Sequence, residues 1–304
     1  MIQPPQPNQR ILVLLFRILN LAFFTVALVI NALGGAKTGE ISNQRQTWIT
    51  PAGFSFGIWG FLYLYLCAFV LYQLLPKTYT PCRLYGYAGA FELITNAIHY
   101  HFICSCIFNS SWILFWNRFP RAWPSLFPMS FLWISLAIMY AQLKQAKQVS
   151  IEDESEQLVQ QDSLNYQNFI SSWAYFLIVT PFTLYFAWIT CATIVNVFAV
   201  AAVINPADPF ATLPLAIGAV IFLASIALLI MFWKKDITFA LPCLWALFGI
   251  LKGNAIQHYP SSQASSFAWV IISTMIVVGL GCVFMMAIKL KKLMGLEQNN
   301  RRNE

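Results

Sequence analysis

Long apolar runs, each about the length of a membrane-spanning helix, constrain this chain more than any other feature. About 20 apolar residues of helix cross a hydrocarbon core about 30 Å thick. Hydrophobic residues make up 59% of the chain and charged residues 10%, whereas soluble domains average about 45–50% and about 25%. We predict an all-α integral membrane protein with eight spans, at Ile11–Leu33, Pro51–Leu75, Leu93–Trp116, Ser125–Leu143, Phe176–Ile204, Thr212–Trp233, Ile237–Gln257 and Ser266–Leu290.

The positions of lysine and arginine predict the side on which the termini lie. An eight-span chain has both termini on one side, and positive residues accumulate on the cytosolic side. That side would hold Arg10, Lys77, Arg83, Lys144, Lys147, Lys234, Lys235, Lys289, Lys291, Lys292, Arg301 and Arg302, and the other side Lys37, Arg45, Arg118 and Arg121. We therefore predict cytosolic tails at 1–10 and 291–304. The polar, acidic segment 144–167 reads as a flexible cytosolic loop. The sequence does not name the membrane.

The entry to the second span, "ITPAGFSFGIWGFLYLYL", combines a proline, three glycines and several aromatic residues. Thr50 can cap the helix, and Pro51 suits its first position because the missing N–H would be unpaired there. Small residues at spacings of four and three let another helix approach closely. We therefore predict helix packing at Gly53, Gly57 and Gly60, with an aromatic face beside it formed by Phe56, Trp59 and Tyr63.

Two further spans carry aromatic stripes that include an asparagine. Ser105, Asn109, Trp112 and Trp116 share one helical face, and Tyr185, Trp188, Ala192 and Asn196 share another. Such stripes suit an apolar pocket with a few polar anchors. Ordinary packing, polar contacts between helices and an interfacial aromatic belt remain the alternative. The predicted ligand-binding residues are Trp59, Tyr63, Asn109, Trp112, Tyr185, Trp188 and Asn196.

These residues resemble the TspO/MBR family of translocator proteins, the tryptophan-rich sensory proteins. The matching motifs are Pro51, Gly53, Phe56, Trp59 and Tyr63 in the second span, Asn109 and Trp112 in the third, and Trp188, Ala192 and Asn196 in the fifth. "NALGGAKTGEIS" before "TPAGFSFGIWG" is similar to the larger, uncharacterised members. One departure is Leu184, which precedes Tyr185 where family members usually have proline.

The resemblance implies a five-helix membrane core at about 11–205, followed by three additional spans at 206–290. Family members bind porphyrins, haem precursors, sterols and synthetic aromatic ligands in a cavity of the five-helix bundle. The resemblance thus implies a sensor or carrier for a flat apolar ligand, namely a tetrapyrrole, a sterol or a lipid. The expected partners are membrane lipids and that ligand. A homodimer stays open, and no nucleic acid is expected.

Other function classes find less support in the sequence. His99 and His101 point about 200° apart on a helix and cannot hold one metal together. No catalytic motif stands out, so we expect neither an enzyme nor a resident cofactor beyond a tetrapyrrole as ligand. The alternative function is a secondary transporter of a lipid or small metabolite, which the number of spans allows. An inverted repeat and coupling charges are not evident in the sequence.

Overall fold

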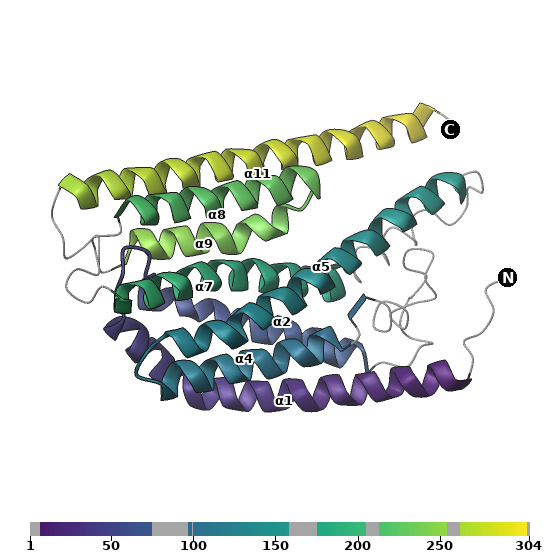
Figure 1. The fold of residues 1–304 in the computed structure, drawn as a ribbon. Helices are drawn as coiled ribbons and strands as arrows, with labels where there is room; N and C mark the ends of the chain where they lie inside the picture. Colours follow the sequence, from purple (N-terminus) through teal and green to yellow (C-terminus); the bar gives the residue numbers. More distant parts are fainter. Residues whose placement is uncertain are drawn as a thin grey trace. The chain divides into compact units, whose positions relative to one another are not determined.

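The computed structural model describes residues 7–74, 97–98, 100–157, 175–204, 213–253 and 262–302. Every element in these ranges is helical, and none of them contains a strand, which confirms the all-α class. The chain forms two compact units (Figure 1). The first unit joins Met1–Gln44 to Phe56–Val200, and the second joins Arg45–Ser55 to Ala201–Glu304.

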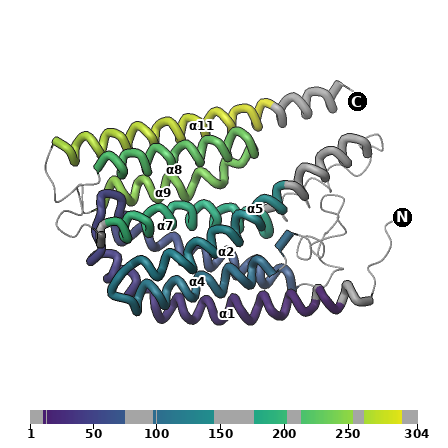
Figure 2. Tube along the Cα trace, in the orientation of Figure 1, coloured from purple at the N-terminus to yellow at the C-terminus, as the bar shows by residue number. Residues whose placement is uncertain are grey.

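The first unit is a bundle of long helices. Its helix α4 packs against both α1 and α5 (Figure 2). Helix α2 also packs against α1. A short π-helical turn, η3, leads into α7 and also contacts α2. The elements of this unit are α1 (Pro7–Gln44), α2 (Ile58–Tyr72), α4 (His101–Arg118), α5 (Trp123–Gln157), η3 (Tyr175–Val179) and α7 (Thr180–Ile204).

Four phenylalanines from four different helices form the centre of this bundle. Phe69 of α2 lies edge-on to Phe182 of α7, with ring centroids 4.9 Å apart. Phe102 of α4 contacts both rings at 5.5 Å and Phe24 of α1 at 6.1 Å. Each ring is at most 4% exposed. Edge-to-face aromatic pairs stabilise a core beyond the area that they bury, so this cluster fixes α1, α2, α4 and α7 around one point.

The second unit contains three apolar helices that pack against one another. They are α8 (Leu213–Trp233), α9 (Ala240–Leu251) and α11 (Ser262–Arg302), with the short 3-10 helix η4 (Ile237–Phe239) before α9. Asp236 caps η4 by accepting a 3.1 Å hydrogen bond from the amide of Thr238. The cap closes the tight connection from α8 to α9.

A segment from far upstream in the chain completes the second unit. The amide of Ala52 donates to the carbonyl of Gly249 at 2.9 Å, and the Trp245 indole N–H donates to the Ser55 carbonyl at 2.9 Å. A Cβ at Gly249 would collide with the side chains of Ser55 and Pro51. The absence of a side chain at position 249 therefore allows the segment Arg45–Ser55 to lie against α9.

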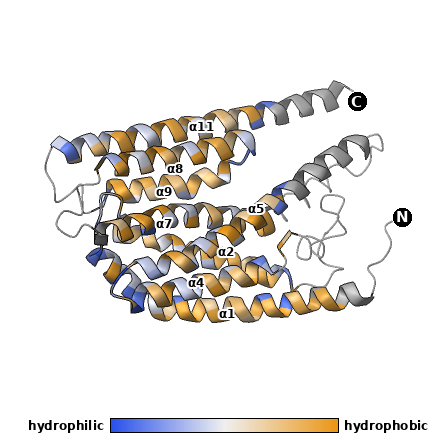
Figure 3. Ribbon diagram, in the orientation of Figure 1, coloured by the Kyte–Doolittle hydropathy of each residue, from blue (hydrophilic) through white to orange (hydrophobic). Residues whose placement is uncertain are grey.

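The outer surfaces of the helices are apolar, as expected for contact with lipid. Leu33 is 82% exposed, Leu215 65% and Leu280 63%. Figure 3 shows hydrophobic residues along most of the helix lengths and polar residues near several ends. Six helices in the described residues are long and apolar enough to cross a membrane. Together with this composition they support an integral, multi-pass membrane protein.

The predicted count of eight spans is not established by these helices. The candidates are Leu14–Gln44, Gly53–Tyr72, Trp123–Lys144, Phe176–Ala201, Leu213–Trp233 and Ser262–Lys291. The third predicted span corresponds in part to α4, which is helical but is not among the six. Its serine and asparagine residues lower its hydropathy. The seventh corresponds to the shorter apolar stretch Ile237–Leu251.

Several boundaries differ from those predicted. Helix α1 continues to Gln44 instead of ending at Leu33. Helix α5 continues to Gln157, so the part of the predicted loop 144–167 up to that residue is helical, and residues 158–167 lie outside the described residues. Helix α11 likewise extends to Arg302, through most of the predicted C-terminal tail. Polar residues continue these helices because a helix satisfies its own backbone hydrogen bonds beyond the apolar run.

The predicted start of the second span is wrong. Thr50 accepts a hydrogen bond from the amide of Thr47 at 2.9 Å and does not cap a helix at Pro51. A 3-10 helix, η1 (Gly53–Gly57), comes first, and α2 begins only at Ile58. Pro51 instead lies in the segment that packs on α9.

Candidate functional site

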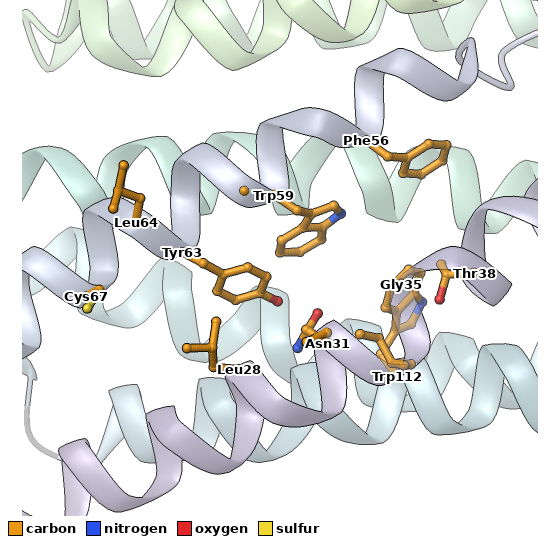
Figure 4. A pocket seen from close by; sticks show the side chains of 13 residues that line it. Leu28, Asn31, Gly35, Thr38, Phe56, Trp59, Tyr63, Leu64, Cys67 and Trp112 are labelled. Atoms are coloured by element: carbon orange, nitrogen blue, oxygen red, sulfur yellow. The ribbon is translucent and has the colours of Figure 1, made fainter.

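A cavity of about 580 Å³ lies in the first unit, between α1, α2 and α4 (Figure 4). Its volume falls within the usual range of small-molecule sites, about 300–1,000 Å³. None of the 13 described residues around it is charged. The lining residues are Leu28, Asn31, Ala32, Gly35, Thr38, Phe56, Trp59, Gly60, Tyr63, Leu64, Cys67, Trp112 and Ile113.

Helical periodicity explains why these residues meet. On α1 the lining residues recur every three or four positions from Leu28 to Thr38, and on α2 from Trp59 to Cys67. Residues with this spacing share one face of a helix. Each helix therefore offers one continuous stripe to the cavity. Figure 4 shows the stripe of α2, with Trp59 and Tyr63, facing the stripe of α1, with Leu28 and Asn31.

Trp59 is the centre of an aromatic wall. Its ring stacks on Tyr63, one turn away, with centroids 5.5 Å apart and an interplanar angle of 19°. Tyr185 and Trp188 of α7 meet Trp59 edge-on at 6.1 and 6.2 Å. Both α7 rings are at most 3% exposed, so they hold Trp59 in place from the side. The wall offers a wide apolar face on which a flat molecule can stack.

Two asparagines and a tyrosine form the polar part of the site. Asn31 Nδ2 donates to Asn109 Oδ1 at 2.7 Å and to the Ala27 carbonyl, one turn back on α1, at 2.8 Å. The Tyr63 hydroxyl donates to the same Asn109 Oδ1 at 3.0 Å. Asn109 is 1% exposed. Within a membrane such groups need partners. This network joins α1, α2 and α4, and it leaves Asn109 Nδ2 buried without a hydrogen-bond partner among the described residues.

Two adjacent glycines of α1, Gly34 and Gly35, have different roles beside α4. A Cβ at Gly34 would lie 2.6 Å from the Ile113 side chain, whereas one at Gly35 would meet nothing within 4 Å. The Gly34 carbonyl accepts hydrogen bonds from the Thr38 hydroxyl at 2.9 Å and from Asn117 Nδ2 at 3.1 Å. Gly34 thus makes the helix contact, and Gly35 leaves space that belongs to the cavity.

The structure places most of the predicted ligand residues around the cavity, some of them on its lining and others behind that lining. Trp59, Tyr63 and Trp112 line the cavity. Asn109 lies behind the lining through its bond to Tyr63, and Tyr185 and Trp188 lie behind Trp59. Asn196 is not a lining residue, because its amide exchanges hydrogen bonds of 3.0 and 3.1 Å with the Ser125 hydroxyl. The ligand-binding roles of these residues stay a prediction.

The three glycines predicted to pack against another helix do not make such a contact among the described residues. A Cβ at Gly53, Gly57 or Gly60 would meet nothing within 4 Å. Gly53 and Gly57 belong to a 3-10 helix, which has three residues per turn, so the α-helical face on which the prediction rested does not form. Gly60 lies on α2 and lines the cavity.

Sequence reasoning missed the contribution of α1. Asn31, Gly35 and Thr38 line the cavity, yet the predicted span ended at Leu33, so their common face was not considered. The signal was present, because a leucine, an asparagine, a glycine and a threonine recur at intervals of three or four from Leu28 onward. Extending the helix by two turns would have revealed it.

The part of the chain that the structure describes contains no cluster of side chains suited to bind a metal ion. There, no group of three or more His, Cys, Asp or Glu side chains is placed to hold a metal ion. His101 is 7% exposed, and its ring lies 4.5 Å from that of Tyr100. His99 lies outside the described residues.

The family of the chain follows from a family-model match that covers most of its length. A family model described as TSPO-like protein matches residues 11–287. The chain belongs to the TSPO-like protein family. The match continues past residue 205, so the C-terminal helices fall within the family pattern. The five-helix core at about 11–205 stays a prediction. Comparisons of this TSPO-like protein with curated proteins and with solved structures gave no match.

Proposed function

We propose that this TSPO-like protein binds a flat, mostly apolar molecule in the cavity between α1, α2 and α4, as a membrane-embedded sensor or carrier. The observation that carries the proposal is the combination of a cavity of about 580 Å³ with the stacked rings of Trp59 and Tyr63 on its wall. A site that is apolar, partly enclosed and equipped with a few polar groups suits such a ligand. Sterols and tetrapyrroles have the required shape and are the first molecules to try.

The organisation around Trp59 supports a preformed site. Its ring is held by contacts with Tyr63, Tyr185 and Trp188, so stacking a ligand on the wall does not require ordering a mobile indole. A site that is rigid before binding loses less conformational entropy on binding. The uncharged lining favours an uncharged ligand, because a charged one would find no oppositely charged side chain among the described lining residues. Ion-coupled transport often depends on charged side chains within the membrane, and none of these lining residues is charged.

The experiment is a titration of the purified protein with cholesterol and with protoporphyrin, followed by tryptophan fluorescence and thermal stability. We expect saturable quenching at one site, together with a rise in melting temperature, because a ligand that binds only the folded state stabilises it. Trp59→Ala should weaken binding at least several-fold. Trp269→Ala is the matched control, since Trp269 on α11 is 65% exposed. Unchanged affinity in a folded Trp59→Ala variant, or no binding by the folded wild type, would overturn the proposal.

We also propose that α4 and the shorter stretch η4–α9 lie within the membrane, which gives eight spans with both termini in the cytosol. The lysine and arginine distribution supports this orientation. The placement of α4 within the membrane is supported by its packing, because Asn109 and Trp112 on that helix are buried in the same bundle as α1 and α5.

A further inference from the structure

The cavity is closed on the side of α4. Trp112 and Ile113 of that helix are 6% and 3% exposed, and Thr38 of α1, which also lines the cavity, is 7% exposed. Trp59 and Tyr63 on α2 are half-buried. The exposure of the lining residues therefore increases away from α4.

Five lining residues are exposed, and all of them lie on α1 or α2. Leu64 of α2 is 72% exposed. At these five residues the cavity reaches the outside of the bundle, and together they form its mouth. The mouth residues are Leu28, Ala32 and Gly35 of α1 and Gly60 and Leu64 of α2.

The mouth is continuous with the lipid-facing surface of both helices. Leu33 follows Ala32 in α1, and Phe61 follows Gly60 in α2. Neither residue lines the cavity, and they are 82% and 56% exposed. Because consecutive residues of a helix point about 100° apart, the mouth adjoins the lipid-facing surface on each helix. The cavity therefore opens sideways, between α1 and α2.

The depth of the mouth within the candidate spans places it away from both membrane surfaces. Leu28 lies near the middle of the span Leu14–Gln44, and Gly60 lies near the middle of the span Gly53–Tyr72. Even the nearer end of a span is about 10 Å away from these residues, at a rise of about 1.5 Å per residue. A mouth at this depth meets the hydrocarbon layer and not water.

Two glycines keep the mouth open. A Cβ at Gly35 or at Gly60 would meet nothing within 4 Å, so no side chain from a neighbouring described helix fills the space beside them. Helix α1 also packs more extensively on α4 than on α2. The side of the bundle between α1 and α2 is therefore the less tightly packed one, and Figure 4 shows the side chains of these two helices on opposite sides of the cavity.

From this geometry, and on the basis of the proposed function, we infer that the site is loaded sideways from the bilayer, and that its ligand is a flat apolar molecule dissolved in the hydrocarbon layer. The five mouth residues are leucine, alanine and glycine, so such a ligand passes from lipid to the Trp59 wall without meeting a polar side chain. A ligand that carries a charge is disfavoured on this route, because a charge at the bilayer centre is costly.

The inference is tested by the rates of ligand exchange. The probe is dehydroergosterol, a sterol that accepts excitation energy from tryptophan, and the purified full-length protein is kept in detergent micelles. Mixing with probe-loaded micelles in a stopped-flow instrument gives the association rate constant. Mixing the complex with excess cholesterol gives the dissociation rate constant.

Two substitutions of one mouth residue change the opening in opposite directions. Leu64→Ala widens it and should raise both rate constants at least about threefold, whereas Leu64→Trp narrows it and should lower both, with the affinity kept within about twofold. A residue that acts only through contacts with the bound ligand changes mainly the dissociation rate. Leu215→Trp is the matched control, since Leu215 on α8 is 65% exposed and lies outside the lining.

Contact of lipid with the mouth is measured separately in vesicles. A fluorophore is attached to Gly60→Cys in a background without native cysteines, and lipids carry a nitroxide either in mid-chain or on the headgroup. We expect stronger quenching by the mid-chain nitroxide and weaker quenching once the probe is bound. Stronger quenching by the headgroup nitroxide would overturn the inference.

The outcomes separate this inference from the proposed function. If the wild type binds the probe but both rate constants stay unchanged in the folded Leu64 variants, or only the dissociation rate changes, the sideways route is wrong and the proposed function stands. Leu64→Ala alone decides if Leu64→Trp does not fold. If the folded wild type binds neither this probe nor cholesterol nor protoporphyrin, the proposed function falls and this inference falls with it.

Discussion

The side-chain amides of Asn31 and Asn109, which are 78 residues apart in the chain, meet at 2.7 Å and join α1 to α4. Asn109 Oδ1 also accepts the Tyr63 hydroxyl, so three helices share one acceptor atom. In a bundle whose neighbours are mostly apolar, each such bond contributes about 0.6 kcal/mol and at most about 1.7 kcal/mol. Removing this acceptor atom therefore tests how much the polar network stabilises the bundle.

Asn109→Leu should destabilise the first unit by about 1–3 kcal/mol, because it leaves two donors without their acceptor. The melting temperature in detergent is the measurement. Ser111→Ala is the control, since the Ser111 hydroxyl makes an exposed bond to the Ile107 carbonyl on its own helix. Adding Asn31→Leu to the Asn109 variant should recover part of the loss. An Asn109→Leu variant as stable as the wild type would contradict this role for the network.

The adjacent glycines of α1 give a second prediction. Gly34→Ala places a methyl group 2.6 Å from Ile113 and should destabilise the α1–α4 contact, whereas Gly35→Ala places one in open space. Both changes gain the same helix propensity, about 1 kcal/mol. We expect a lower melting temperature for Gly34→Ala and an equal or higher one for Gly35→Ala. The reverse order would show that α1 does not pack on α4 through Gly34.

The segment Arg45–Ser55 yields a prediction for the second unit. Gly249→Ala should force the segment away from α9, because the added Cβ would lie 2.9 Å from Ser55 Cβ and 3.1 Å from Pro51 Cβ. Gly218→Ala on α8 adds a Cβ with nothing within 4 Å and serves as the control. The measurement is maleimide labelling of Ile49→Cys, a position that is 1% exposed, with the native cysteines replaced. Faster labelling in the Gly249 variant alone is expected, and equal labelling in both would count against the packing.

Topology is tested at two single-cysteine positions in the same cysteine-free background. With cytosolic termini, Ser155→Cys should react with a membrane-impermeant maleimide only from the cytosolic side, and Asn43→Cys only from the opposite side. Inside-out and right-side-out vesicles provide the two exposures. Labelling of both positions from one side would contradict the eight-span arrangement.

The sequence was sufficient for the fold class, and its predicted aromatic stripes include three of the residues that line the cavity. Run length alone predicts membrane helices, and the spacing of Trp59, Tyr63 and Trp112 placed them correctly on common faces of α2 and α4. These properties are local, since each depends only on residues within a few turns. The same reasoning failed at Gly53 and Gly57, where a 3-10 helix replaced the expected α-helix.

What the sequence could not provide are the contacts between distant residues. The segment Arg45–Ser55 is held by Trp245 and Gly249, about 190 residues away, and that packing rather than local propensity delays the start of α2. Asn196 had the right helical position for the predicted site, but Ser125 of α5 satisfies its amide. A stripe on one helix does not reveal which neighbouring helix will supply the partner.

The central claim, that the space between α1, α2 and α4 is a ligand site, is tested most directly by filling it from one position on α1. Gly35 lines the cavity, and Gly39, one turn further along the same helix, does not. A Cβ at either residue meets nothing within 4 Å, so leucine at each should leave the fold intact. The measurement is the affinity for cholesterol and protoporphyrin by tryptophan quenching in the wild type, Gly35→Leu and Gly39→Leu. The account predicts a loss of at least about tenfold for Gly35→Leu and little change for Gly39→Leu. Equal, wild-type affinity in both folded variants would contradict it.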